Sequence, residues 1–235
     1  MTLNLLPFSW FSRRMTAVLF DYPKSAAFGR ILPKSKIYEH TGPSTAVKKL
    51  FVQQIEQIVW QFKLAPETVN LKPSRAMPEI QIFRIALKTG ELKHDVLHCI
   101  DRAIPFPILF ELRYEEKIKT IAAFKRPSDA DHSKWVVSGY FESSWLPTDA
   151  PRTPLPVVRD LEVLYAQLLA PLMRFPARPA EALQSRVERM ELIGARQREL
   201  EKCEIRLRKE KQFNRKIAIN AELRHLKQEL GKLME

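Results

Sequence analysis

Three side chains in the middle of the chain have types and spacing that could bind a metal ion. His94, His98 and Asp101 follow one another at intervals of four and three residues, so a helix here would place all three on one face. Imidazole and carboxylate groups are suitable ligands for Zn²⁺. His94 is followed by Asp95 and not by the glutamate of a zinc-protease helix. We therefore interpret the two histidines as exposed surface residues and keep the metal site as the weaker alternative.

A second group could support magnesium-dependent hydrolysis. The sequence Glu115-Glu116-Lys117 contains the acidic-x-lysine element of restriction-type nucleases, in which carboxylates bind Mg²⁺ and the lysine orients water. Glu79 and Glu111 lie on predicted strands and could add carboxylates. The element falls at a predicted hairpin turn, however, which favours charged turn residues. The alternative is a divergent nuclease subunit that uses Glu79, Glu111, Glu116 and Lys117.

Other catalytic patterns are missing, and the charge of the chain favours binding. The sequence has no Gly-x-Ser-x-Gly elbow, no Walker or dinucleotide motif and no zinc ribbon, and its two cysteines, Cys99 and Cys203, are far apart. We predict no cofactor. Lys and Arg number 39 against 27 Asp and Glu, a net charge of +12. The excess lies at the two ends of the chain, which favours a polyanionic or acidic partner.

The elements that position these residues are predicted from hydrophobic periodicity. A short strand over 17–20 and a loop over 28–36 come first, and a helix then begins at Ser44 or Thr45 and reaches Lys63. Further strands are predicted over 79–88, 108–114, 118–124 and 134–141, with a helix over 91–103. This order predicts an α/β or α+β fold, a mixed β-sheet flanked by helices.

The chain is predicted to contain a body and an arm. Residues 1–14 are an N-terminal extension, 15–146 the body, 147–156 a proline-rich connector, 157–179 a docking helix and 180–235 a helical, coiled-coil arm. In the arm, proline is absent and apolar residues recur every three or four positions, although their phase slips between runs. The longest run predicts a partner or homodimer seam formed by Leu223, Leu226, Leu230 and Leu233.

Two clusters of basic residues could contact phosphate groups or an acidic protein. The first surrounds Gly29 and consists of Arg30, Lys34 and Lys36. The second lies in the arm and consists of Arg208, Lys211, Arg215 and Lys216. For the first cluster we favour the interpretation that it is a solvated connector. For the second we favour a charged coiled coil whose basic residues pair with glutamates at helical spacing.

Several motifs together resemble a bacterial and archaeal family of unknown function. They are Phe28-Gly-Arg-x-Leu-Pro-Lys-x-Lys-Ile-Tyr38, Leu64-Ala-Pro-x-Thr68, Glu79-Ile-Gln-Ile-Phe83, Ile100-Asp-x-x-Ile-Pro-x-Pro-Ile-Leu-Phe110, Lys134-Trp135 and Phe213-Asn-Arg-Lys216. The resemblance covers about residues 16 to 230. As the resemblance implies, members of this family are often encoded beside helicase and DNA methyltransferase genes in restriction-modification and phage-defence clusters. The resemblance implies no catalytic residue.

These observations favour a binding protein over an enzyme. We expect a non-catalytic subunit of a bacterial DNA-targeting defence or restriction-modification-type system that docks on a helicase or DNA methyltransferase through its arm. The alternatives are the magnesium-dependent nuclease subunit and a basic nucleic-acid-binding protein. The chain has no apolar run long enough to span a membrane and no convincing signal peptide, so we expect a cytoplasmic protein.

Overall fold

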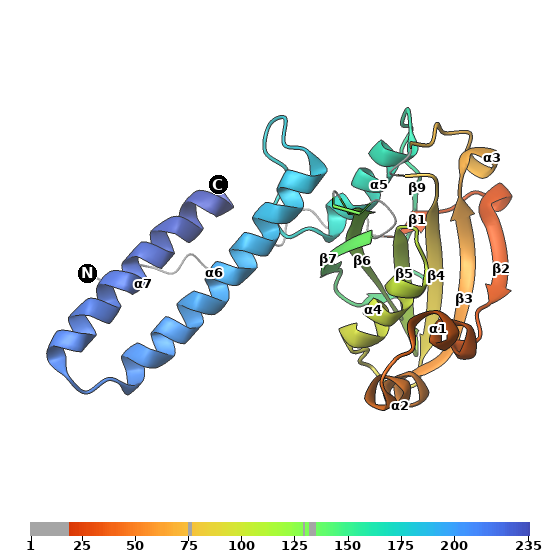
Figure 1. Cartoon of the computed structure of the whole chain (residues 1–235). Coiled ribbons are helices and arrows are strands. Elements are labelled where there is room, and N and C mark those ends of the chain that lie inside the picture. Colours follow the sequence, from red (N-terminus) through yellow and green to blue (C-terminus); the bar gives the residue numbers. More distant parts are fainter. Residues whose placement is uncertain (1–18, 75–76, 129, 132–134) are drawn as a thin grey trace. The chain divides into compact units, whose positions relative to one another are not determined.

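The computed structural model describes residues 19–74, 77–128, 130–131 and 135–235 (Figure 1). The predicted extension over 1–14, and the first half of the predicted strand over 17–20, lie outside these residues. The chain divides into two compact units, Met1–Leu172 and Met173–Glu235. No helix among the described residues is long and apolar enough to cross a membrane.

The first unit contains a mixed sheet, as the sequence predicts, and this sheet has seven strands. Along the sheet the order is β2-β3-β4-β5-β6-β7, with β8 also paired to β6. The pair β4–β5 is parallel and the other pairs are antiparallel. Parallel neighbours need a long crossover, and α4 lies in it. The strands are β2 (Ala27–Ile31), β3 (Ile55–Leu64), β4 (Ile80–Leu87), β5 (Ile108–Tyr114), β6 (Lys117–Pro127), β7 (Trp135–Glu142) and β8 (Leu146–Pro147).

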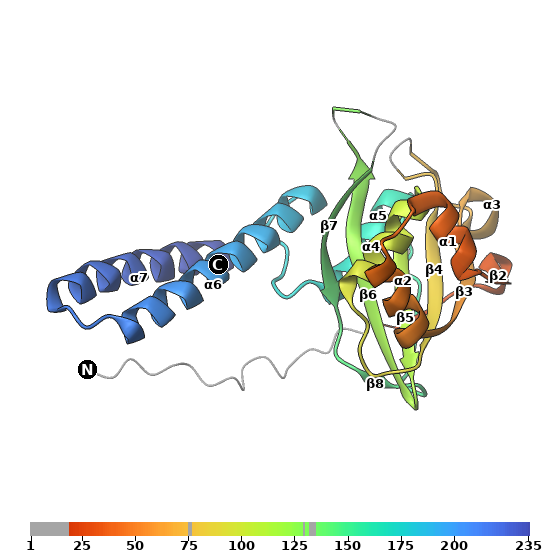
Figure 2. The same ribbon diagram turned by 60° about the horizontal axis from the view of Figure 1, so that its bottom comes forward.

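Three helices cover one face of the sheet, α1 (Lys34–Thr41), α2 (Thr45–Gln54) and α4 (His94–Ala103) (Figures 1 and 2). The Ser44 hydroxyl accepts a hydrogen bond from the Val47 amide at 3.3 Å and caps α2, as predicted. The core on this face contains Phe51 of α2, Ile100 of α4 and apolar residues of the strands. Alternation along each strand sends every second side chain into this core.

The opposite face of the sheet is covered in part by α5 (Leu161–Leu169), followed by the 3₁₀ turn η3 (Ala170–Leu172). Asp160 caps α5 by accepting the Val163 amide at 2.8 Å. The Tyr165 ring stacks on Phe124 of β6, and its hydroxyl donates to the Ala123 carbonyl at 2.6 Å. The remaining elements of this unit are the paired strands β1 (Phe20–Asp21) and β9 (Thr153–Pro154), the 3₁₀ turn η2 (Lys24–Ala26) and the short helix α3 (Pro66–Val69).

The prediction of one helix from Ser44 to Lys63 is wrong beyond Gln54, where the chain turns into β3. The apolar residues of this segment fit both periods, because Ile55 and Ile58 are spaced for a helix while β-branched and aromatic residues favour a strand. Pairing with both β2 and β4 decides for the strand. On this strand, the ring of Trp60 packs against those of Phe28 and Phe83.

The prediction of a loop over 28–36 is also wrong. Residues 27–31 form β2 and residues 34–41 form α1. Gly29 has a φ of 65°, a conformation that glycine adopts without strain, and it lies where the register of β2 against β3 shifts. The glycine and the prolines of this segment therefore mark a bulged edge strand and a helix start, which sequence alone does not separate from a loop.

The second unit is a helical hairpin. Helix α6 (Leu183–Lys209) ends before a short turn, and α7 (Phe213–Met234) returns along it (Figure 1). Two apolar clusters join the helices. Phe175 and Ile193 pack with Leu230, and Cys203 packs with Leu223 and Leu226. The turn falls between two of the apolar runs whose phase slips in the sequence, so the predicted arm is helical but folded back on itself.

Candidate functional site

The predicted leucine seam lies inside the hairpin. Leu223, Leu226 and Leu230 are buried, and the clusters that contain them include residues of α6. Leu233 is partly buried beside Leu230. The seam thus has a partner in its own chain, and a homodimer through these leucines would require α7 to separate from α6.

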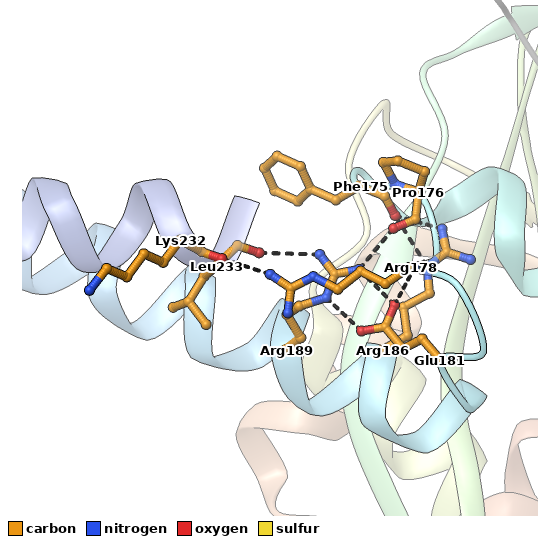
Figure 3. Close-up of polar contacts among 8 residues, drawn as sticks. All are labelled: Phe175, Pro176, Arg178, Glu181, Arg186, Arg189, Lys232 and Leu233. Carbon is orange, nitrogen blue, oxygen red and sulfur yellow. Dashed lines mark hydrogen bonds and ion pairs between the residues drawn. The ribbon is translucent and has the colours of Figure 1, made fainter. Parts of the chain in front are cut away.

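A network of arginines fastens the end of the hairpin opposite its turn (Figure 3). Arg189 donates from Nε to Glu181 Oε1 at 2.6 Å and from Nη2 to Glu181 Oε2 at 2.8 Å. The same guanidinium donates to the carbonyls of Pro176 at 2.8 Å and Leu233 at 3.2 Å. One side chain therefore joins the segment before α6 to the last turn of α7.

Two further arginines complete this network. Arg186 donates from Nε and Nη2 to the Phe175 carbonyl at 3.1 and 2.7 Å, and Arg178 donates to the Lys232 carbonyl at 2.7 Å. The carbonyls at the end of a helix have no partners within the helix and carry a partial negative charge, so guanidinium groups stabilise them. We interpret this end of the hairpin as structural.

The network predicts a specific loss of stability in acid. Hydrogen bonds from Arg189 lower the pKa of Glu181 from 4.5 to about 2. A depressed pKa means that the ionised carboxylate stabilises the fold above about pH 4.5, and that this contribution is lost as the pH falls toward 2. We expect Glu181→Gln to be less stable than the natural chain at neutral pH, with the difference shrinking over that range. Denaturant unfolding followed by circular dichroism measures it.

The exposed Glu188 provides the control, since its carboxylate accepts only from Gln184 at 3.0 Å. Glu188→Gln should change stability little at any pH. A difference between Glu181→Gln and the natural chain that stayed constant down to pH 2 would show that the Arg189–Glu181 pair does not stabilise the hairpin.

The turn of the hairpin is fixed by Glu210. Its carboxylate Oε1 accepts the amides of Lys211 at 2.8 Å and Gln212 at 2.9 Å. These bonds, with the nearby charges of Arg215 and Lys216, lower the pKa of Glu210. An ionised carboxylate next to the first turn of α7 is also favourable to the helix dipole. The turn thus has a defined shape.

The basic residues predicted in the arm gather at this turn. Arg208 lies in the last turn of α6, and Arg215 and Lys216 lie in the first turn of α7. The turn between the helices brings these residues together with Lys211. None of these four residues forms a salt bridge within the described part of the chain. Arg206 differs, because it pairs across the hairpin with Glu222 at 2.5 Å. The pairing of the whole basic segment with glutamates, expected for a charged coiled coil, is thus seen only in part.

Apolar side chains lie among these charges. The side chain of Phe213 is 75% exposed and that of Ile217 is 51% exposed. We call residues 205–217 the basic tip. Its basic side chains, Arg206, Arg208, Lys209, Lys211, Arg215 and Lys216, outnumber its one acidic side chain, Glu210. A surface that combines unpaired cations with an exposed aromatic ring is suited to phosphate contact and base stacking, or to an acidic protein.

The basic cluster near Gly29 does not form a comparable surface. Arg30 lies over the Phe28 ring at 4.5 Å, and Lys34 donates to the Ile55 carbonyl at 2.6 Å. Partial burial lowers the pKa of Lys34. Lys36 forms an ion pair with Glu39 at 2.9 Å. Lys34 and Lys36 are thus engaged within the body.

The four residues of the nuclease alternative are not brought together. In the β4–β5 register, Glu79 and Glu116 lie toward opposite ends of the sheet, about ten residues or roughly 30 Å apart at 3.3 Å per residue. Glu111 is between them and is bound by Arg152 at 2.8 Å. Glu79 pairs with Lys63 at 3.2 Å. Glu116 and Lys117 lie at the β5–β6 turn, so these groups cannot share one metal ion.

His94, His98 and Asp101 meet at Tyr140, not at a metal site. The rings of His94 and His98 lie 5.0 and 4.9 Å from the Tyr140 ring, and the Tyr140 hydroxyl donates to Asp101 Oδ2 at 2.5 Å. Both histidines are exposed, as predicted, but Asp101 is buried and also pairs with Lys125 at 3.5 Å. Burial raises the pKa of Asp101. Within the described residues, no group of three His, Cys, Asp or Glu is arranged to hold a metal ion.

Fold and site together define a mixed α/β domain that carries a helical hairpin with a basic tip. Residues 20–230 match the family described as Domain of unknown function (DUF4391), and the chain belongs to this family. No curated protein and no solved structure gave a significant match.

Proposed function

We propose that this protein is a non-catalytic subunit of a DNA-targeting defence or restriction-modification-type assembly in the cytoplasm. The observation that carries the proposal is the basic tip, which presents the exposed Phe213 and four cations without a salt bridge to a described residue, at the turn of a hairpin whose other end is fastened by arginines. In this proposal the first unit provides a stable platform and the hairpin is the docking element.

The resemblance supports the choice of partner. It implies gene neighbours that encode a helicase and a DNA methyltransferase, and both classes of enzyme act on a polyanion. The tip is suited to this setting, because Arg and Lys side chains can contact phosphate oxygens or the acidic rim of a protein. The leucines of the predicted seam support the hairpin from within, so the tip takes over the docking role.

Direct nucleic-acid binding by the same tip is the second candidate. It is favoured by Phe213, because an aromatic ring that is 75% exposed among cations provides a stacking surface for an unpaired base. An acidic protein partner would need the charges but not this ring. The two candidates therefore share the tip and differ in what remains bound after nuclease treatment.

A charge reversal at the tip tests the proposal. We expect Arg215→Glu/Lys216→Glu in the full chain to lose the partners that the natural chain retains, because two cations of the tip become anions that repel a polyanionic or acidic surface. The measurement is an affinity pull-down from the native host, with and without nuclease, read by mass spectrometry. A helicase or methyltransferase that survives nuclease supports the docking role, and nuclease-sensitive DNA alone supports direct binding.

The matched control reverses two cations elsewhere on the hairpin. Arg198 and Lys202 are exposed on α6 and form no salt bridge with a described residue. Arg198→Glu/Lys202→Glu changes the net charge by the same amount and should keep the partners. Equal capture by the tip variant and the natural chain would refute the docking role of the tip.

A further inference from the structure

Three arginines gather around one glutamate on the face of the sheet that α5 covers in part. Arg84 of β4 lies beside Glu111 of β5 in the parallel register, and Arg113 lies two pairs further along beside Ala86. These residues share a face because side chains alternate along a strand. Arg152, from the segment before β9, reaches the same carboxylate.

The single carboxylate of this cluster is already occupied. Arg152 donates to both oxygens of Glu111, from Nη1 at 2.8 Å and from Nη2 at 3.2 Å, and also to the Phe20 carbonyl at 2.7 Å. Arg84 Nη2 lies 3.6 Å from Glu111 Oε2. Arg113 has no ion pair with any described residue. Three guanidinium charges therefore surround the Glu111 carboxylate, and Asp21 adds a second negative charge that acts on Arg152 at longer range.

The spare arginines also have donors without acceptors. Arg84 Nε and Arg113 Nε are both buried and lack a hydrogen-bond partner among the described residues. Buried donors are nearly always satisfied in folded proteins, because leaving one unpaired costs free energy. Burial and the nearby charge of Arg113 both lower the pKa of Arg84, which means that its charge is poorly compensated.

The cluster can be reached from solvent. The side chains of Arg84 and Arg152 are 28% and 25% exposed.

We propose that Arg84 and Arg113, supported by Arg152, bind a phosphate group. A phosphate has several oxygens and up to two negative charges, so it can accept hydrogen bonds from the solvent-accessible parts of these side chains and neutralise the excess charge. Guanidinium groups are well matched to it, because their planar donors bind two oxygens in parallel. The phosphate could belong to a free phosphorylated small molecule or to a polynucleotide backbone. The site is separate from the basic tip and does not depend on the proposed function.

Calorimetric titration of the full chain tests this site. The probes are pyrophosphate, ATP and a short single-stranded oligonucleotide, the last titrated into the Arg215→Glu/Lys216→Glu background so that the tip does not contribute. We expect Arg113→Ala to weaken binding by about tenfold or more, because charged hydrogen bonds are lost. Arg113→Lys keeps the charge but not the planar pair of donors, so its affinity for the probes should lie between those of the natural chain and Arg113→Ala. It replaces Arg113→Ala in the test if that variant does not fold.

Arg102 is the matched control, since it is an exposed arginine on α4, the helix that covers the other face. Arg102→Ala should bind each probe as the natural chain does. Binding of pyrophosphate or ATP that depends on Arg113 would identify a free phosphorylated ligand. Binding of the oligonucleotide alone, again dependent on Arg113, would identify a polynucleotide. Absence of binding to all three probes, or equal binding by the Arg113 variants, would overturn the proposal.

Discussion

A variant that ends at Leu172 should stay folded and lose its partners completely. Residues up to Leu172 form a compact unit with the seven-stranded sheet. The core on the sheet contains Phe51, Phe83 and Phe110 and uses no residue of the hairpin. We therefore expect a cooperative thermal transition and a circular dichroism spectrum of a mixed α/β protein. The pull-down used for the tip variant should recover no specific partner.

The deletion and the charge reversal together separate two docking surfaces. If the basic tip alone docks, the deletion and Arg215→Glu/Lys216→Glu should lose the same partners. If the outer faces of α6 and α7 also contribute, only the deletion should lose all of them. Full recovery of a helicase or methyltransferase by the variant that ends at Leu172 would place docking on the first unit and contradict the role of the hairpin.

Strands with unambiguous patterns were predictable from sequence. The segment 79–88 is rich in β-branched residues, and 108–114 and 118–124 are separated by a short charged turn, so their patterns predict β4, β5 and β6. Segment 55–64 was not predictable, because its apolar spacing also fits a helix. Only pairing with β2 and β4 decides it, and pairing with a distant strand is not a local property of the sequence.

The candidate site shows the same limit. The density of Arg and Lys predicts the residues of the basic tip, but not that a turn at 210–212 gathers them away from most glutamates. The spacing of Leu223, Leu226 and Leu230 predicts a buried seam without telling whether its partner is another chain or α6. The cluster of Arg84, Arg113 and Arg152 carries no sequence signal, because its members come from three separate segments.

Glu111→Ala should strongly destabilise the first unit. The Glu111 side chain is 2% exposed, and its removal leaves Arg152 and Arg84 without their carboxylate. Removing one partner of a buried ion pair strands the other charge and typically costs 3–5 kcal/mol. Because Arg152 remains a quarter exposed, we expect a loss of about 3 kcal/mol in the free energy of unfolding, the lower end of that range.

Denaturant unfolding of the full chain measures this loss, and Glu116→Ala is the control. Glu116 is exposed at the β5–β6 turn and accepts one long hydrogen bond from Thr148, at 3.3 Å, so its removal should change stability by less than about 0.5 kcal/mol.

The pair of variants also tests the nuclease alternative. If Glu111 were a metal ligand, Glu111→Ala would abolish Mg²⁺-dependent cleavage and change the free energy of unfolding little. A structural Glu111 gives the opposite result, because its carboxylate is held by arginines and its removal leaves three partly buried positive charges without it. An Ala variant as stable as the natural chain would contradict the structural assignment.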